Sequence, residues 1–366
     1  MITLRRLIYR EVVAAVAFVA LGFLALFFFF DFVDELPGVT RTGSDYQLAH
    51  AMLYVLLQVP NHLYELLPIA VLIGTIFVMA RLAQSSEFTI LRTSGLGPWR
   101  ALRSLLGLGL IFTLLTFAAG DYLAPAADRA GQLLKARYQG QLSVGQTGAW
   151  LKERQPDRNY TVNVMALTPD GALQGVRIFE SDLRGFMVSM TQARRAEFGE
   201  DAWILKDVER IGFGATATGT ALASGQRQAS VTWPTSISSE MVSVALLKPD
   251  RMRTLDLFQY IRHLESNGQT SQRYEIEFWR KVFYPLSCLV MVVLALPFAY
   301  LHFRSGGITG YVFGGVLIGI SFFLLNNVFG YIGNLGNWLP WLTAAAPGLI
   351  YSLMSLGAFG WLVLRR

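Results

Sequence analysis

Long apolar runs lie towards both ends of the chain, and a long polar stretch separates them. The first run, 12–30, holds no charged residue, and as a helix it reaches roughly 28 Å, enough to cross the hydrocarbon core of a bilayer. Its length, with no small-residue cleavage site after it, predicts a retained anchor rather than a signal peptide. Five similar runs follow, so the pattern predicts six transmembrane helices, the others at 63–82, 101–119, 282–301, 308–328 and 338–364.

The polar stretch, 138–247, has a period of two. In 159–167 apolar and polar side chains alternate, and a turn signal follows at 168–171. Other strand-like runs recur at regular intervals, at 176–179, 186–190, 203–205, 215–223 and 229–233. Regular short strands predict a β-sandwich or barrel. The expected fold class is therefore an α-helical membrane protein with six transmembrane helices and an inserted all-β domain.

Two polar helices are expected between the β stretch and the fourth span. Thr254 can cap a helix that has Leu257 and Ile261 on its apolar face, and Gly268 can end it. A second helix from about Arg273 runs into the span. The predicted domains are 1–137, with the first three spans; 138–247, the β domain; and 248–366, with the last three.

Arginine positions predict the orientation, because Lys and Arg in short loops are held on the cytoplasmic side. If the N-terminus is cytoplasmic, that side carries Arg5, Arg6, Arg10, Arg81, Arg92, Arg100, Arg103, Arg304, Arg365 and Arg366. The short loops on the other side hold Arg41 alone. We therefore expect both termini in the cytoplasm and the β domain exported.

Composition supports a membrane protein, because only 15% of the 366 residues are charged, against about 25% in soluble domains. One cysteine, Cys288, excludes an intramolecular disulfide, and four scattered histidines lack metal-ligand spacing, so no metal or cofactor is expected. The net charge of +6 does not indicate nucleic acid, since the arginines flank apolar segments. No P-loop or hydrolase motif occurs. We expect no enzyme, and any ATP hydrolysis would belong to another subunit.

The loop 81–97, between the second and third spans, predicts a short helix on the membrane surface at about 84–95. It has a capping serine, an acid in the first turn, an apolar face and a terminal glycine, namely Ser85, Glu87, Phe88 with Leu91, and Gly95. Such a helix suits a groove on a soluble partner. The equal alternative is an interfacial turn whose apolar face enters the headgroups.

This loop resembles the A-Q-x-S-E-x-x-x-x-x-x-S-G coupling segment of the LptF/LptG permease family, the membrane subunits of the lipopolysaccharide export transporter. The similarity covers nearly the whole chain, because six spans with one exported β domain between the third and fourth is that family's layout. Further matching motifs are Phe32-Val33-Asp34, Leu123-Ala124-Pro125, Leu247-Lys248-Pro249-Asp250, Arg273-Tyr274 and Pro285-Leu286-Ser287. Residues closer to the LptG branch than to the LptF branch are Gln84, Ser86, Glu87 and 145–150.

The resemblance implies a bacterial inner-membrane protein with a periplasmic β-jellyroll. It would pair with an LptF-like subunit around a cavity that takes lipopolysaccharide from the outer leaflet. An LptB-like ATPase dimer would drive it from the cytoplasm. An LptC-like single-span protein would add a helix near the lateral gate, and a periplasmic LptA-like bridge would receive the lipid.

The resemblance also implies roles for residues. ATPase coupling would fall to Ser86, Glu87, Phe88, Leu91 and Arg92, with Glu87 meeting a basic residue of the ATPase. The lipid phosphates would be bound by Arg41, Arg129, Lys135 and Arg137. For each of these cations, anchoring of a span end to anionic headgroups is the equal alternative. Where family members carry lysines at the end of the first span, this chain has Asp31, which leaves contact between that span and the phosphates open.

A transported lipid must stay covered, since its acyl chains would cost about 0.8 kcal/mol per CH₂ in water. This requirement predicts an apolar path. Cavity or gate residues would be Phe27, Phe30, Glu65, Phe322, Phe323 and Asn326, and the path along the β domain would include Tyr160, Val162 and Val164. Alternatives remain open: an interfacial position for Glu65, packing within the chain for Asn326, and an ordinary sheet core for the β residues.

Two other function classes compete with transport. A membrane-embedded hydrolase could use Asp31, His62 or Glu65, although no motif supports it. A membrane-anchored scaffold would display the β domain without moving a lipid. Substitution of Glu87 separates the transporter from the scaffold, because only the transporter should lose ATP-driven lipid release.

Overall fold

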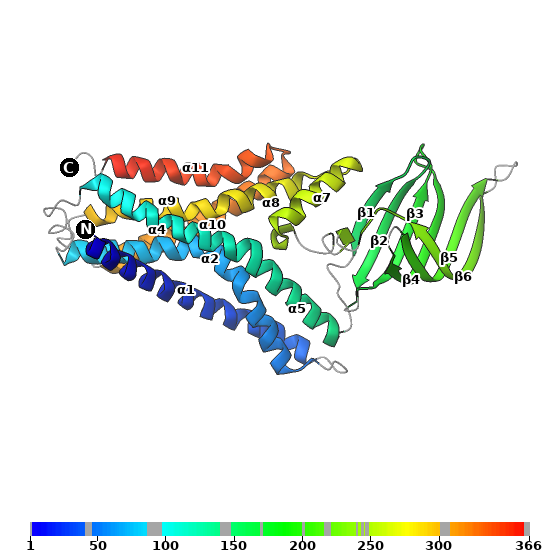
Figure 1. Ribbon diagram of the computed structural model, residues 1–366, viewed down its shortest axis with the longest axis horizontal. Helices are drawn as coiled ribbons and strands as arrows, with labels where there is room; N and C mark the ends of the chain where they lie inside the picture. Colours follow the sequence, from blue (N-terminus) through cyan, green and yellow to red (C-terminus); the bar gives the residue numbers. More distant parts are fainter. Residues whose placement is uncertain are drawn as a thin grey trace. The chain divides into compact units, whose positions relative to one another are not determined.

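The computed structural model describes residues 2–40, 46–85, 97–139, 148–168, 171–199, 202–215, 221–238, 241–242, 245, 249–300 and 308–361. These residues form long helices and one β-sheet (Figure 1). The chain divides into two compact units. The helical unit comprises 1–36, 55–128 and 275–366, and the sheet unit comprises 37–54 and 129–274.

Six helices in the described part of the chain are long and apolar enough to cross a membrane, which confirms that expectation. Before the sheet these are α1 (Ile2–Val39), α2 (Leu48–Gln84), and α4 (Pro98–Ala118), which continues through the π-helical turn η1 (Ala119–Leu123) into α5 (Ala124–Gln139). After the sheet come α8 (Gln272–Phe283), the 3₁₀ turn η3 (Tyr284–Leu286), α9 (Ser287–Ala295), the 3₁₀ turn η4 (Leu296–Tyr300), α10 (Ile308–Leu335) and α11 (Pro340–Phe359).

The first two helices are longer than predicted. α1 begins at Ile2 rather than near 12, and α2 begins at Leu48 rather than near 63. About 20 residues are enough to cross a bilayer, and the predicted spans have that length, whereas helical backbone hydrogen bonds continue through the flanking turns. Glu65 consequently lies well inside α2 rather than near its start.

The sheet consists of antiparallel strands in sequence order, β1 (Ala149–Arg154), β2 (Asn159–Leu167), β3 (Leu173–Ser181), β4 (Met187–Phe198), β5 (Ala202–Ala215) and β6 (Ala221–Pro234). An all-β insertion between helices is thus confirmed. Figure 1 shows these strands as a single curved sheet. The jellyroll topology stays a prediction that this strand order is compatible with.

Strand positions follow the alternating pattern in the first half of the sheet and depart from it in the second. β2 has the predicted bounds, and Gly171, with a φ of +81°, donates to the Thr168 carbonyl in the turn that follows. The run 215–223 was predicted as one strand, which is wrong, because Ala215 on β5 pairs antiparallel with Ala221 on β6. β1 was not predicted as a strand.

The sheet core is built from side chains that face each other across neighbouring strands. Leu151 pairs with Val162 and Val162 with Ile178, and none of the three is more than 3% exposed. Trp203 is also buried and donates from Nε1 to the Ile237 carbonyl at 2.8 Å. Matching residues across strands is what stabilises a sheet.

The polar helix α7 (Thr254–Ser266) follows the sheet and the 3₁₀ turn η2 (Pro249–Arg251). Thr254 is the first residue of α7 and not its cap, because Arg253 holds the cap position with extended backbone. The predicted end is confirmed. Gly268 has a φ of +63°, and the next amide donates back to the Leu264 carbonyl at 2.8 Å, as in a glycine-terminated helix.

Candidate functional site

A polar contact joins α1 to α2 in the helical unit. The Asp31 carboxylate on α1 lies 2.6 Å from His62 Nε2 on α2. The Phe27 ring, one turn before Asp31, lies 4.9 Å from the imidazole. One turn further along α2, Glu65 accepts a hydrogen bond from Asn61 at 3.1 Å. Two of the predicted cavity residues, Phe27 and Glu65, thus border one polar cluster.

A buried lysine lies at the π-helical turn η1. Lys281 on α8 is 6% exposed and donates from Nζ to the Gly120 carbonyl at 3.0 Å. Its ammonium also lies 5.9 Å from the centre of the Tyr64 ring. A Cβ at Gly120 would lie 2.3 Å from that ring, so glycine is required at this position. Charged groups inside membranes pair with such carbonyls, and π-turns often mark functional sites.

Two of the predicted gate residues on α10 face the interior of the helical unit. Phe322 is 2% exposed and packs against the rings of Tyr284 and Tyr351. Asn326 is also buried, and its carbonyl accepts from Arg280 at 2.7 Å. Large apolar side chains elsewhere on α10 are exposed, namely Phe313, Leu317, Ile320, Leu324, Val328 and Tyr331. The exposed surface of α10 is therefore apolar, and a cavity or gate role for Phe322, Phe323 and Asn326 stays a prediction.

The sheet unit holds a cavity of about 240 Å³, lined by residues of β2 to β6. Tyr160 and Trp233 form an aromatic wall with ring centres 5.6 Å apart. Val162 and Val164, predicted on the same face as Tyr160, are completely buried in the sheet core. Of the three predicted path residues, only Tyr160 lines this cavity.

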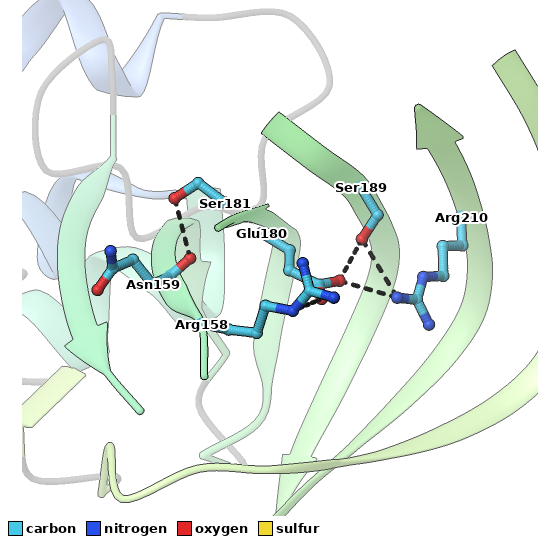
Figure 2. A network of polar contacts seen from close by, with 6 residues as sticks. All are labelled: Arg158, Asn159, Glu180, Ser181, Ser189 and Arg210. Atoms are coloured by element: carbon cyan, nitrogen blue, oxygen red, sulfur yellow. Dashed lines mark hydrogen bonds and ion pairs between the residues drawn. The ribbon is translucent and has the colours of Figure 1, made fainter. Parts of the chain in front are cut away.

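Glu180, the cross-strand neighbour of Tyr160, also lines the cavity together with Ser189 and Arg210, and these three belong to the polar network in Figure 2. Glu180 on β3 is 13% exposed and accepts hydrogen bonds from Ser189 at 2.6 Å and from Arg210 at 2.8 Å. Arg158, in the turn before β2, approaches the same carboxylate within 3.5 Å. Burial raises the pKa of Tyr160, and the Glu180 charge raises it further by a smaller amount. The phenol therefore stays neutral beside two guanidinium groups.

A second buried carboxylate lies where β1 meets the end of β6. Glu153 is 5% exposed and accepts from the Thr235 hydroxyl at 2.5 Å and from the Ser236 amide and hydroxyl at 2.8 Å. Its charge also raises the pKa of His263 on α7, but burial acts more strongly and holds that pKa below 6.5. Since hydrogen bonds satisfy it, Glu153 is a structural group.

Residues 6–365 match the family model for the lipopolysaccharide export system permease LptF/LptG. The chain belongs to the LptF/LptG permease family. It is 30% identical over 339 residues to the lipopolysaccharide export system permease protein LptG of Escherichia coli K12, across 92% of this chain and 90% of that protein. The LptG protein of Haemophilus influenzae is 25% identical over 368 residues, across 100% and 99% of the two chains.

In this LptF/LptG chain the predicted coupling residues lie outside the described residues. They are Ser86, Glu87, Phe88, Leu91 and Arg92. On one side, α2 ends at Gln84, where Arg81 forms a salt bridge with Glu11 of α1. On the other, α4 starts with Pro98 after an extended Gly97. Coupling by this segment stays a prediction.

The predicted phosphate-binding cations have different surroundings. Arg129 on α5 forms a salt bridge of 2.5 Å with Asp256 of α7. The Lys135 ammonium lies 3.9 Å from the centre of the Tyr54 ring. Arg137 belongs to α5, but its side chain is not described, and Arg41 lies outside the described residues. The structure thus brings together no pair of these four side chains within the described residues.

Lys281 and the Glu180 network were both missed in the sequence. Lys281 directly precedes the predicted fourth span, where a lysine usually anchors a span end. Gly120, one residue beyond the predicted end of the third span, is the only local signal of a close approach. The Glu180 network depends on strand register, which places Ser189 opposite Glu180 and Arg210 on the next strand. Those pairings cannot be read from spacing alone.

Proposed function

We propose that this chain is an LptG-type permease subunit of an ATP-driven lipopolysaccharide exporter of the bacterial inner membrane. Its membership of the LptF/LptG family supports the transport role, and the curated relatives carry the LptG name. The supporting observation in the structure is the exposed apolar surface of α1 and α10. Only 17% of the most apolar part of α1 and 22% of that of α10 is buried.

These exposed surfaces support pairing with a second membrane subunit. On α1 they include Phe18, Leu21, Phe29 and the predicted gate residue Phe30, which is 56% exposed. Lipid can cover part of such a surface, but an apolar cavity for acyl chains also needs a facing wall. An LptF-like subunit would supply that wall, and an LptC-like helix would enter beside it.

Coupling to an LptB-like ATPase dimer is proposed for the segment between α2 and α4. Both helices are tied into the bundle: α2 contacts α1 through Arg81 and Glu11, and the Ala101, Leu105 and Leu108 side chains of α4 are buried. A displacement at the loop would therefore be transmitted to packed helices. Glu87 would form the charged contact, with Phe88 and Leu91 as apolar anchors.

The decisive experiment is reconstitution of the chain with an LptF-like subunit, an LptC-like protein and an LptB-like ATPase in proteoliposomes. We expect ATP-dependent release of lipopolysaccharide to a soluble LptA-like acceptor, and Glu87→Ala should reduce it at least about tenfold. Glu265→Ala, on the exposed side of α7, is the matched control and should leave release unchanged. Release that persists in Glu87→Ala would contradict the coupling role. A complex that assembles but never releases lipid would favour the scaffold.

The proposed topology has both termini in the cytoplasm and the β domain in the periplasm. The one cysteine, Cys288, is buried, so cysteines introduced elsewhere can be labelled selectively. Ser85→Cys, after α2, and Arg184→Cys, in the β3–β4 turn, are exposed positions. In intact cells a membrane-impermeant maleimide should label Arg184→Cys and leave Ser85→Cys unlabelled. The reverse labelling would overturn the topology.

Phosphate contacts are proposed for Lys135 and Arg137, which lie two residues apart on α5. Arg129 is the weaker candidate, because a phosphate would compete with Asp256. Lys135→Ala should weaken lipopolysaccharide binding by the complex without changing its basal ATPase rate. A matched change, Lys152→Ala on β1, should have no effect on binding.

A further inference from the structure

We propose that Arg158 and Arg210 in the sheet unit form a binding site for the phosphate of a phosphorylated sugar. The inference rests on the proposed function and deepens it, since it assigns the β domain a contact with the headgroup of the transported lipid. The observation that carries it is the network of Figure 2 beside the cavity of about 240 Å³.

The two guanidinium groups are held in place and still have free donors. Arg210 is 55% exposed and uses one terminal nitrogen for both Glu180 and Ser189. Arg158 is 40% exposed and faces Glu180 with Nε. In the described part of the chain the remaining N–H groups of both side chains have no partner. A guanidinium fixed on one edge can bind a phosphate through another edge with two parallel hydrogen bonds.

Glu180 is the positioning residue of this pair. Its carboxylate is largely buried and contacts both arginines, which keeps two like charges near each other. One carboxylate against two guanidinium groups leaves one positive charge. That excess is what an anion needs, because a fully neutralised cluster would not attract it.

The neighbouring cavity wall indicates what the phosphate is attached to. Tyr160 and Trp233 present their rings to the cavity, and the side chains of Gln226 and Gln228 lie along it. Aromatic faces beside amide groups suit a sugar ring, which has apolar C–H faces and hydroxyl edges. Together with the two arginines, this wall favours a phosphorylated sugar as the class of ligand.

The rest of the sheet offers a contrast that serves as a control. Arg227 on β6 also contacts a glutamate, Glu209, at 3.3 Å, but its side chain is 85% exposed and it pairs one to one. This pair leaves no excess charge. Arg227→Gln therefore tests what the loss of any surface arginine does to the β domain.

The test uses the whole complex in phosphatidylethanolamine vesicles, with a photoreactive amino acid at Thr191, which lines the cavity. The probes are lipopolysaccharide and the same lipid after enzymatic removal of its sugar phosphates. With ATP, the double change Arg158→Gln and Arg210→Gln should reduce crosslinking of the phosphorylated lipid at least about fivefold, and Arg227→Gln less than about twofold. The dephosphorylated lipid should crosslink weakly in every variant. Inorganic phosphate alone should compete only weakly.

Glu180→Gln separates binding from structure. A glutamine at this position keeps a side-chain oxygen that can accept from Arg210, but it removes the negative charge. If the arginines bind an anion, the two positive charges are then no longer offset, and crosslinking should stay level or rise. If the network only holds the strands together, Glu180→Gln should reduce crosslinking as much as the double arginine change. Equal losses would overturn the proposal. Because Glu180→Gln keeps both arginines, a loss of crosslinking in that variant alone would also overturn it, should the double variant fold poorly.

Other outcomes distinguish this site from the function itself. ATP-driven release to the acceptor without any crosslink at Thr191 would overturn the site and leave the proposed function standing. Equal crosslinking of both lipids, or full competition by inorganic phosphate, would also overturn it. Loss of release in the unmodified complex would overturn both.

Discussion

The helices α1 and α2 have similar lengths but opposite surroundings. The most apolar part of α1 is more hydrophobic than that of α2, yet 17% of it is buried against 83% for α2. In a soluble protein the more apolar helix would be the more buried one. In a bilayer, lipid tails are as apolar as leucine, so burial depends on shape and on polar contacts instead.

The shape of α2 explains its central position. Gly74 lets the backbone of α1 approach closely, because a Cβ there would lie 2.7 Å from the Val16 nitrogen. On α10, Gly315 and Gly319 similarly accommodate Ile76 and Ile69 of α2. Small residues at helix contacts are the usual way that membrane helices associate. The exposed side of α1, in contrast, carries large side chains that a partner or lipid must cover.

The largest effect is expected when the glycine contact between α1 and α2 is filled. Gly74→Ala should destabilise the folded chain by about 2 to 3 kcal/mol, because the added methyl group overlaps the α1 backbone. Gly22→Ala, on α1 with nothing within 4 Å of a Cβ, should be neutral or stabilising by about 0.5 kcal/mol. Unfolding in mixed detergent micelles measures both. Equal effects would mean that α1 and α2 do not touch at Gly74.

Side chains on the two sides of α1 should also respond differently to substitution by alanine. Val12 is completely buried and Phe18 is 79% exposed. Val12→Ala should cost about 1 to 2 kcal/mol through lost packing, and Phe18→Ala less than about 0.5 kcal/mol despite the larger side chain. A larger loss for Phe18 in the isolated chain would contradict the exposed surface. In the assembled complex the order should reverse if a partner covers Phe18.

A smaller effect is expected from the polar link between the same helices. The double-mutant cycle of Asp31→Asn and His62→Gln should give a coupling energy of about 1 kcal/mol, typical of a hydrogen-bonded contact. Asn61→Ala, which removes a contact within α2 alone, is the control. Additive effects of the two changes would show that Asp31 and His62 act independently.

The sequence predicted the elements whose positions follow from hydrophobic periodicity and from the placement of charged residues. Long apolar runs located the six spans, and alternation located β2 to the residue, because burial on one side leaves a direct trace in the pattern. Helix lengths were underestimated, since helical turns such as 48–62 continue beyond the roughly 20 residues that cross a bilayer. The antiparallel pairing of Ala215 with Ala221 was missed, because spacing along the sequence does not record which residues pair.

Partners across the fold could not be predicted in the same way. Phe322 and Asn326 were predicted from their residue types. Which side of α10 packs against the rest of the helical unit depends on contacts with Tyr284, Tyr351 and Arg280. Lys281 resembles a span-end anchor until Gly120 is found beside it. The spacing of residues along the sequence indicates which side chains are buried. Predicting a site also requires knowing which residues contact each other in the fold.

The smallest expected effect concerns pH and separates the sheet unit from the helices. Burial holds the pKa of His263 below its ordinary value of 6.5, although the nearby Glu153 opposes this. The unfolded chain therefore takes up this proton at a higher pH than the folded chain does. The stabilisation is complete above about pH 6.5 and is lost as the pH falls through the folded-state pKa.

Hydrogen exchange of α7 and β1 measures this effect. Asn267 Nδ2 lies 3.3 Å from His263 Nδ1, and the Asn267 side-chain oxygen accepts a hydrogen bond from the backbone N–H of Arg154 on β1 at 3.0 Å. Protonation of His263 should therefore loosen both elements together. Relative to the intrinsic, base-catalysed exchange rate, the protection of these amides should fall between pH 7.5 and pH 5.5 in the unmodified chain, and His263→Gln should remove that fall. The contact at Gly74 is made with Val16 of α1, so the protection of the amides there should be the same at both pH values. Acid sensitivity that persists in His263→Gln would assign the titration to another group.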